Sequence, residues 1–406
     1  MLDTRDRAAG VSAPPPEGIG NTRGSNGDST RDSTRTRDPY AALAAQQAMP
    51  SAGSLEDFLH GTHFDAADPA VLRDVLHALI QRGYDRSPFV PLPGHGQTLA
   101  RWRALAAVAA CDLGLVKLFE GHTDALAILA ELRGPTPPVE SRWGVWAAEP
   151  PDARVQASKR STRSDATRTD DPAQLYLSGT KAWCSGAAVV SHALITAWLD
   201  DEPVLAAVAM DHASISVDAS KWQAVGMQAT ASADVTFTQT PATLVGAAHA
   251  YVRRPGFWHG GAGIAACWYG AAAQIGRTLR EASTQRADAH RFAHLGAVEV
   301  ALAGAAAVLR ETAAHIDANP HADSQREAMR ARLIVEEAAT AVMNHATRTL
   351  GAGPLCRDAR FARALADLPV FLRQSHAERD LAALGELTVK VNDERDAAAG
   401  GAPWML

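Results

Sequence analysis

Two neighbouring residues in the stretch LYLSGTKAWCSG, Trp183 and Ser185, carry side chains that could hold a flat aromatic ligand. An indole ring can cover an aromatic face, and a hydroxyl can form a hydrogen bond with a polar edge. The same residues also fit an ordinary hairpin, with the tryptophan buried in a sheet and the serine in a turn. Taken alone, this pair leaves both interpretations open.

Other features of the chain exclude several classes of protein. Its four cysteines lie far apart without a CxxC pair, which predicts no metal site and favours a reducing, cytoplasmic setting. The formal net charge is -6 and no basic stripe stands out beyond the N-terminal region, so we expect no nucleic-acid partner. The longest weakly polar run, residues 256–276, is built from Gly and Ala and contains His259, so we expect no membrane span.

The elements that must position Trp183 and Ser185 fall into three ordered units. Apolar residues recur at helical spacing first, short alternating runs between turn residues follow, and the helical spacing then returns. The pattern predicts an α+β fold that is mainly α, with N-terminal helices, a middle antiparallel β domain and a C-terminal four-helix bundle. The expected boundaries are a disordered tail at 1–53, the helical domain at 54–135, the β domain at 136–247, the bundle at 248–390 and a flexible tail at 391–406.

Three motifs follow one another in the predicted β domain. The first is VWAAEP, with Trp146, Ala147 and Ala148. The second is LSGTKAWCSGA, with Trp183 and Ser185, and the third is WQAVGMQATASADVTF. In this order they resemble motifs of the acyl-CoA dehydrogenase superfamily, flavoproteins with the same three-part architecture. The resemblance covers nearly all of the chain outside the two tails.

The resemblance implies a FAD cofactor and a place for each part of its isoalloxazine ring. Trp183 would cover the flat or apolar part of the ring, and the Ser185 hydroxyl would lie near N5. The backbone amides of Ala147 and Ala148, which follow Trp146, would meet the pyrimidine edge, where negative charge develops on reduction.

The chain departs from the family where the rest of the cofactor would lie. The family's Arg-x-x-Phe-Gly segment, which helps to hold the pyrophosphate, is missing, and its Gly-Ser-Asp after Glu-Pro is replaced by PPDARVQ. A Gly-rich turn with Gly351 and Gly353 remains and resembles the family's adenine-side loop. As the end of a helix, however, such a turn needs no ligand.

The family's catalytic glutamate is also absent. Residues 373–375, Arg-Gln-Ser, occupy its usual place, and the alternative site at 261–263 reads Gly-Ala-Gly. An arginine cannot accept a proton at neutral pH. Because oxygenase relatives carry a histidine near the C-terminal bundle, we take His376 in the altered segment as the candidate catalytic residue. Glu378 and Asp380 beside it fit a solvated helix face.

These observations favour a FAD-dependent oxidoreductase that acts on an acyl-CoA or a related small molecule with atypical chemistry. Two alternatives stay open: a flavin-dependent monooxygenase or oxidase on the same fold, and a degenerate relative that serves as a structural or partner subunit. A carboxylate that reaches the site from Asp367 or Glu378 would restore dehydrogenase activity. Because the family assembles through its bundle, we expect a homodimer or homotetramer, together with an electron-transfer or reductase partner.

Overall fold

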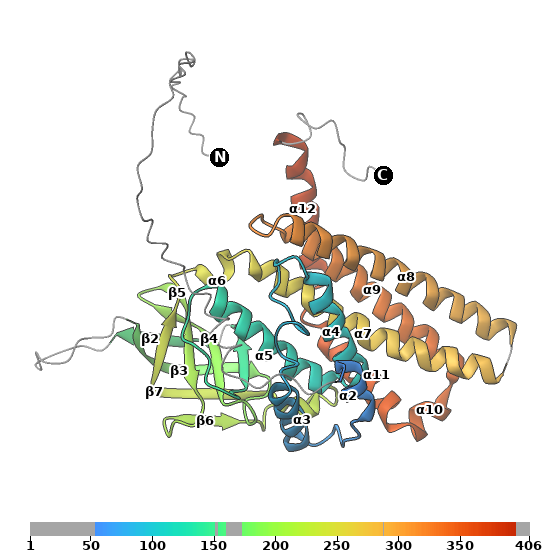
Figure 1. Cartoon of the computed structure of the whole chain (residues 1–406), viewed down its shortest axis with the longest axis horizontal. Helices are drawn as coiled ribbons and strands as arrows, with labels where there is room; N and C mark the ends of the chain where they lie inside the picture. The colour runs from blue at the N-terminus through green and yellow to red at the C-terminus, as the bar shows by residue number, and fades with distance from the viewer. Residues whose placement is uncertain (1–52, 151–152, 160–172, 287, 395–406) are drawn as a thin grey trace, which may run out of the picture.

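The computed structural model describes residues 53–150, 153–159, 173–286 and 288–394, and the two predicted tails lie almost entirely outside these ranges. The described residues form three packed units, as Figure 1 shows: N-terminal helices, a β-sheet and long C-terminal helices. The predicted α+β class is confirmed. The N-terminal helices lie between the sheet and the long helices, so residues from all three units can meet in one place.

The N-terminal unit contains α2 (Leu55–Gly61), α3 (Pro69–Gln81), α4 (Thr98–Cys111) and α5 (Leu113–Glu131). α3 begins after Asp68, whose side chain accepts a hydrogen bond from the N–H of Ala70. α5 begins after Asp112, which accepts from the N–H of Leu115 at 2.8 Å. α5 packs against both the sheet and the C-terminal helices and is buried along almost its whole length.

The described residues of the middle unit form one sheet of seven strands: β1 (Trp143–Trp146), β2 (Val155–Lys159), β3 (Gln174–Cys184), β4 (His192–Leu199), β5 (Glu202–Ala209), β6 (Ile215–Asp218) and β7 (Ala233–Val245). The strand order is β1-β4-β2-β3-β7-β5, and β6 pairs with β7 outside this order. Because β5 also pairs with β4, the sheet closes into a small barrel. Most strand pairs are antiparallel as expected, including β4 with β5, but β4 runs parallel to β1 and β2. Alternation of apolar residues is the same in both orientations and could not reveal this.

The C-terminal unit contains α6 (Ala250–Arg253), α7 (Gly256–Gln285), α8 (Ala289–Ala318), α9 (Gln325–Leu350), α10 (Ala352–Arg357), α11 (Ala359–Leu372) and α12 (Glu378–Glu394). The long helices α7, α8 and α9 pack side by side (Figure 1). The end of the predicted bundle is divided into two helices: α11 continues through Pro369 and ends at Leu372, and α12 starts after a turn. α12 then projects from the body of the molecule.

One long helix, α8, leaves most of its apolar surface uncovered. By length and composition it could cross a membrane, with a mean hydropathy of 1.8, and only 17% of this apolar stretch is buried. Phe292 and Val300 on this helix are 51% and 75% exposed. A single such helix is weak evidence for a membrane span. Contact with a second copy of the chain would cover this apolar face. The homo-oligomer that the sequence predicts therefore stays a prediction.

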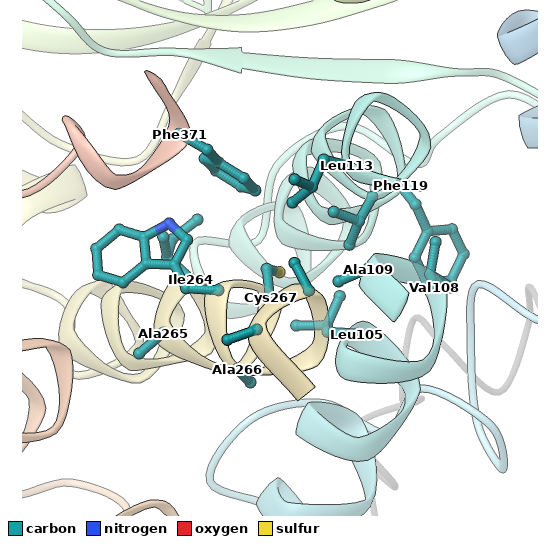
Figure 2. Packing of buried hydrophobic residues seen from close by; sticks show 14 of the residues in the cluster. Leu105, Val108, Ala109, Leu113, Phe119, Ile264, Ala265, Ala266, Cys267 and Phe371 are labelled. Carbon is teal, nitrogen blue, oxygen red and sulfur yellow. The ribbon is translucent and has the colours of Figure 1, made fainter. Parts of the chain in front are cut away.

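The main core lies where α4, α5, α7 and α11 meet. Figure 2 shows Leu105 of α4, Cys267 of α7 and Phe371 of α11 grouped in one cluster. Small residues on α7 allow the helices to approach closely: a Cβ added at Gly270 would lie 2.2 Å from the carbonyl oxygen of Ala106 on α4. This packing fixes the helices that form the inner walls of the cavity described next.

Candidate active site

A cavity of about 420 Å³ lies at the junction of the three units. Its walls come from α5, the ends of β1 and β3, the start of α7, α9 and the turn before α12. Six of the residues singled out from the sequence line this one cavity: Trp146, Ala147, Ala148, Trp183, Ser185 and His376. Gly351 and Gly353 do not line it, and both are exposed where α9 meets α10.

The backbone at Trp183 explains why its indole ring reaches the cavity. The register between β3 and β7 shifts between Lys181 and Cys184, which marks a bulge, and Trp183 lies in it with a φ of 59°. A bulky residue in this left-handed region costs about 1–3 kcal/mol and persists only where its surroundings hold it. Trp183 is 59% exposed, so the hairpin interpretation with a tryptophan buried in the sheet is wrong.

Ser185 follows this bulge and is tied to both neighbouring elements. Its carbonyl oxygen accepts a hydrogen bond from Trp146 Nε1 at 3.0 Å, which joins the ends of β1 and β3. Its hydroxyl lies 3.0 Å from Ser232 Oγ. The next N–H, that of Gly186, donates to the carbonyl oxygen of Thr230 at 2.7 Å. The half-buried Ser185 hydroxyl is therefore held at a fixed place on the cavity wall.

The loop at residues 147–148 is held by an ion pair. Lys181 is fully buried and donates to Glu149 Oε1 at 3.0 Å and to Thr196 Oγ1 at 2.6 Å. Trp198 Nε1 donates to Glu149 Oε2 at 2.9 Å. Burial alone raises the pKa of Glu149, but the hydrogen bond from Trp198 and the charge of Lys181 outweigh it and lower the pKa overall. Glu149 therefore stays ionised and fastens the loop to the barrel.

Two carboxylates from α5, Glu120 and Asp124, also line the cavity, and reasoning from the sequence missed both. Glu120 lies 3.0 Å from Lys117 Nζ. Asp124 lies 3.9 Å from Arg254, and burial raises the pKa of Asp124 and favours its neutral form. A signal was present: charged residues three or four apart in the otherwise apolar run LGLVKLFEGHTDALAIL mark a polar stripe on a buried helix.

The two places where the family carries its base hold no carboxylate, and Gly261 and Gln374 line the cavity there. The carboxylates considered as substitutes lie elsewhere. Asp367 is buried and accepts a hydrogen bond from the backbone N–H of Met227, and Glu378 is exposed at the start of α12. Neither Asp367 nor Glu378 lines the cavity, so neither can replace the missing glutamate in this arrangement.

His376 reaches the cavity from the turn between α11 and α12, with Asp380 as its partner. The backbone N–H of His376 donates to Asp380 Oδ2 at 3.0 Å, and His376 Nδ1 lies 3.4 Å from Asp380 Oδ1. Arg332 of α9 donates to the carbonyl oxygens of Gln374 and Gly261, each at 2.8 Å, and so fixes this turn against α7. The side chain of Asp380 is 21% exposed and lines the cavity, so this residue belongs to the cavity wall as well as to the face of α12.

No protein-family model and no curated protein matches this sequence, whereas solved structures match its fold. TdsC, a dibenzothiophene monooxygenase from Paenibacillus sp. A11-2, is similar with a TM-score of 0.65 and 18% identity, over 83% of this chain and 93% of that chain. Butyryl-CoA dehydrogenase from Megasphaera elsdenii is similar with a TM-score of 0.64 and 15% identity, over 79% of this chain and 90% of that chain. The chain has the acyl-CoA dehydrogenase fold.

The acyl-CoA dehydrogenase fold confirms the three-part architecture that the motifs predict. KijD3 has the same fold, with a TM-score of 0.64 and 18% identity over 86% of this chain and 96% of that chain. It was solved in complex with FMN and dTDP-3-amino-2,3,6-trideoxy-4-keto-3-methyl-D-glucose, and TdsC was solved in complex with FMN and indole. At 15–18% identity the likeness extends to the fold, so the function depends on this chain's own cavity residues.

Proposed function

We propose that this chain binds a flavin in the cavity and acts as a flavin-dependent monooxygenase on a small molecule. The observation that carries the proposal is that one cavity joins an exposed aromatic platform, Trp183, and an oriented histidine, His376. A dehydrogenase needs a carboxylate base at the substrate, whereas the family's two positions hold Gly261 and Gln374, and Glu120 and Asp124 on α5 face Lys117 and Arg254. The likeness to TdsC and KijD3, both solved with FMN, supports the same conclusion.

The cavity residues fit an isoalloxazine ring. Trp183 offers an exposed aromatic face, Ser185 a hydroxyl beside it, and the loop of Ala147 and Ala148 backbone groups for the polar pyrimidine edge. When bound, the flavin would supply the redox chemistry that passes one atom of O2 to the substrate. The protein's part would be to hold the ring, to keep water away from it and to place a proton-transferring group.

His376 would be that proton-transferring group. Its Nδ1 faces Asp380, so the carboxylate orients the imidazole and leaves Nε2 for the substrate or the cofactor edge. Arg332 would support this role indirectly, because it holds the turn that carries His376. A positioned general acid or base typically contributes about two to four orders of magnitude in rate.

Aromatic residues close the cavity beside α6 and α7, and they favour a small apolar substrate. Tyr251 and Phe257 pack edge to face with ring centroids 5.5 Å apart, and Phe257 and Trp258 do the same at 5.2 Å. The volume of about 420 Å³ must also hold the flavin ring. The remaining space therefore suits an aromatic or heteroatom-containing molecule better than a long acyl-CoA chain.

FMN is the form of flavin that this chain supports best, in place of the FAD expected from its sequence. Trp183 also lines a second cavity, of about 330 Å³, together with Lys221 and Trp222. Lys221, which forms an ion pair with Asp234 at 2.6 Å, is the cation that a ribityl phosphate extending past Trp183 would meet in this second cavity. The adenine-side turn at Gly351 borders neither cavity, so it contributes nothing to the flavin site within one chain.

Electrons would come from a separate protein. A cavity of this size holds one flavin ring and a small substrate, and a nicotinamide dinucleotide would not fit beside them. We therefore expect a reductase or electron-transfer partner. The uncovered face of α8 favours assembly into a homo-oligomer as well.

The activity is tested with purified protein, FMN, NADH and a flavin reductase, with indole and an aromatic thioether as probe substrates under O2. Oxygenated product that needs both this protein and O2 supports a monooxygenase. Rapid reduction of the bound flavin by butyryl-CoA in the absence of O2 would instead show a working dehydrogenase. A protein that binds no flavin would refute both readings and favour a structural role.

Two variants test the assigned residues. His376→Asn should lower product formation by about 10²–10⁴-fold without weakening FMN binding. Its matched control is His321→Asn, an exposed histidine between α8 and α9 that does not line the cavity. Lys221→Met should weaken binding of FMN but not of riboflavin, which lacks the phosphate. Equal losses for FMN and riboflavin would contradict the proposed place of the phosphate.

A further inference from the structure

Two histidines from neighbouring helices meet at the contact between α8 and α9. The Nδ1 atoms of His294 and His345 lie 2.8 Å apart, and the two ring centroids lie 5.1 Å apart with the ring planes tilted by 56°. His294 lies near the start of α8, and His345 lies near the end of α9. Neither histidine lines the candidate active-site cavity or the second cavity beside it, so the proposed function gives this histidine pair no role.

The histidine pair can present two lone pairs to one point without losing a proton. At 2.8 Å the two Nδ1 atoms share a hydrogen, which one ring donates and the other accepts. A neutral imidazole carries its hydrogen on either nitrogen. When the donating ring moves this hydrogen from Nδ1 to Nε2, both Nδ1 atoms have a free lone pair. Neutral imidazole nitrogens of this kind are the commonest metal ligands in proteins.

The distance between the two nitrogens indicates which metals the pair suits. A metal ion lies about 2.0–2.1 Å from an imidazole nitrogen, so two such nitrogens lie about 2.8–3.0 Å apart at a right angle and about 3.3–3.4 Å apart at a tetrahedral angle. The observed 2.8 Å fits the right angle between neighbouring ligands of Cu²⁺ or Ni²⁺. A tetrahedral Zn²⁺ would require the two side chains to separate by about 0.5 Å.

We propose that His294 and His345 form a two-ligand site for Cu²⁺ that fastens α8 to α9. Both side chains are half-buried, and water completes the coordination, because no group of three or more ligand side chains is arranged for a metal among the described residues. The cation Arg291 on the same helix directs its Nη1 to the carbonyl oxygen of Ala282 at 2.6 Å. The cysteine spacing, which predicts no metal site, carries no information about two histidines 51 residues apart.

Calorimetric titration of the full chain with CuCl₂, NiCl₂ and ZnCl₂, after treatment with a chelator, tests the proposal. Cu²⁺ should bind most tightly, and Ni²⁺ more tightly than Zn²⁺. His294→Gln and His345→Gln should each weaken Cu²⁺ binding at least about tenfold, because loss even of an outer partner of a metal ligand typically costs about 10–100-fold. His321→Gln, at an exposed histidine between α8 and α9, is the matched control and should keep the affinity. Cu²⁺ should also raise the thermal midpoint of wild type but not of the two pair variants.

The outcomes separate a metal site from a hydrogen bond that only joins two helices. Glutamine keeps a donor and an acceptor, so His294→Gln without metal should have a thermal midpoint close to that of wild type. Cu²⁺ affinity that is equal in His294→Gln and His321→Gln overturns the proposal, and tighter binding of Zn²⁺ than of Ni²⁺ overturns the right-angle geometry. Electron paramagnetic resonance of the wild-type Cu²⁺ complex, which needs no variant to fold, should show two imidazole nitrogens. A spectrum without nitrogen ligands overturns the proposal as well.

Discussion

Replacement of Lys181 by methionine should damage both the fold and flavin binding. Lys181 is fully buried, and Glu149, whose side chain is 24% exposed, would lose its cation but keep its hydrogen bond from Trp198. Breaking a fully buried ion pair costs about 3–5 kcal/mol, and the partial exposure of Glu149 reduces this to about 2–3 kcal/mol. Because Glu149 follows the loop at 147–148, FMN affinity should fall at least about tenfold in the variant that still folds.

Urea unfolding at neutral pH measures the stability, and FMN titration of the folded protein measures the affinity. The double variant Lys181→Met/Glu149→Gln leaves no unpaired charge and should recover at least half of the lost stability. The pKa of Glu149 is lowered in the folded protein, so its contribution is complete above its ordinary pKa of 4.5 and is lost as the pH falls through the lowered value. The difference between wild type and Lys181→Met should therefore shrink as the pH falls below 4.5 and through the lowered pKa of Glu149.

The matched control is Lys159→Met, an exposed lysine on β2, which should change the stability by less than about 0.5 kcal/mol. A Lys181→Met variant that matches this control would refute the reasoning. So would a double variant that is no more stable than Lys181→Met. A destabilised variant with unchanged FMN affinity would show that the ion pair supports the barrel but not the loop.

Burial raises the pKa of Asp112 to about 6 from 3.8, so folding favours its protonated form and stability falls as the pH rises through this range. Asp112→Asn keeps the α5 cap and should be about 1–3 kcal/mol more stable than wild type at pH 8 but not at pH 3, as urea unfolding would show. Gly270→Ala should cost about 2–3 kcal/mol because its Cβ meets a backbone oxygen, whereas Gly304→Ala, with nothing within 4 Å, should add up to about 1 kcal/mol. Equal changes of the thermal midpoint in Gly270→Ala and Gly304→Ala would contradict the close packing of α7 against α4. Val300→Lys should dissociate the oligomer in sedimentation, and a wild type that is already monomeric would contradict the role of α8.

The site residues found from the sequence are those whose role is set by local pattern. Trp183 and Ser185 lie within one short motif, and Trp146 begins another, so their place could be predicted without knowledge of the packing. Glu120 and Asp124 come from a helix that precedes these motifs, and only the docking of α5 against the barrel brings them to the cavity. The polar stripe on α5 shows in the sequence, but the unit that this stripe faces does not, because periodicity describes one element at a time.

The differences between the predicted and the observed fold have similar causes. The parallel pairs of β4 involve strands distant in the sequence, and the left-handed backbone of Trp183 depends on a bulge that alternation does not show. The break between α11 and α12 follows Leu372 although Pro369, the expected helix breaker, lies inside α11. The position of Pro369 therefore does not predict the end of α11. The turn that carries His376 could be located only from the structure.

The cavity takes its walls from residues between Lys117 and Asp380, so it cannot be complete before residue 380 has been synthesised. During synthesis the helical domain and the barrel can fold while the last helices are still being added. His376 joins this cavity after the helical domain and the barrel, because only α12 follows it in the described chain. A product shortened before this turn could fold and bind FMN and still be inactive, which would make it a competitor for the reductase. The turn between α11 and α12 is thus the last part of the cavity to be built.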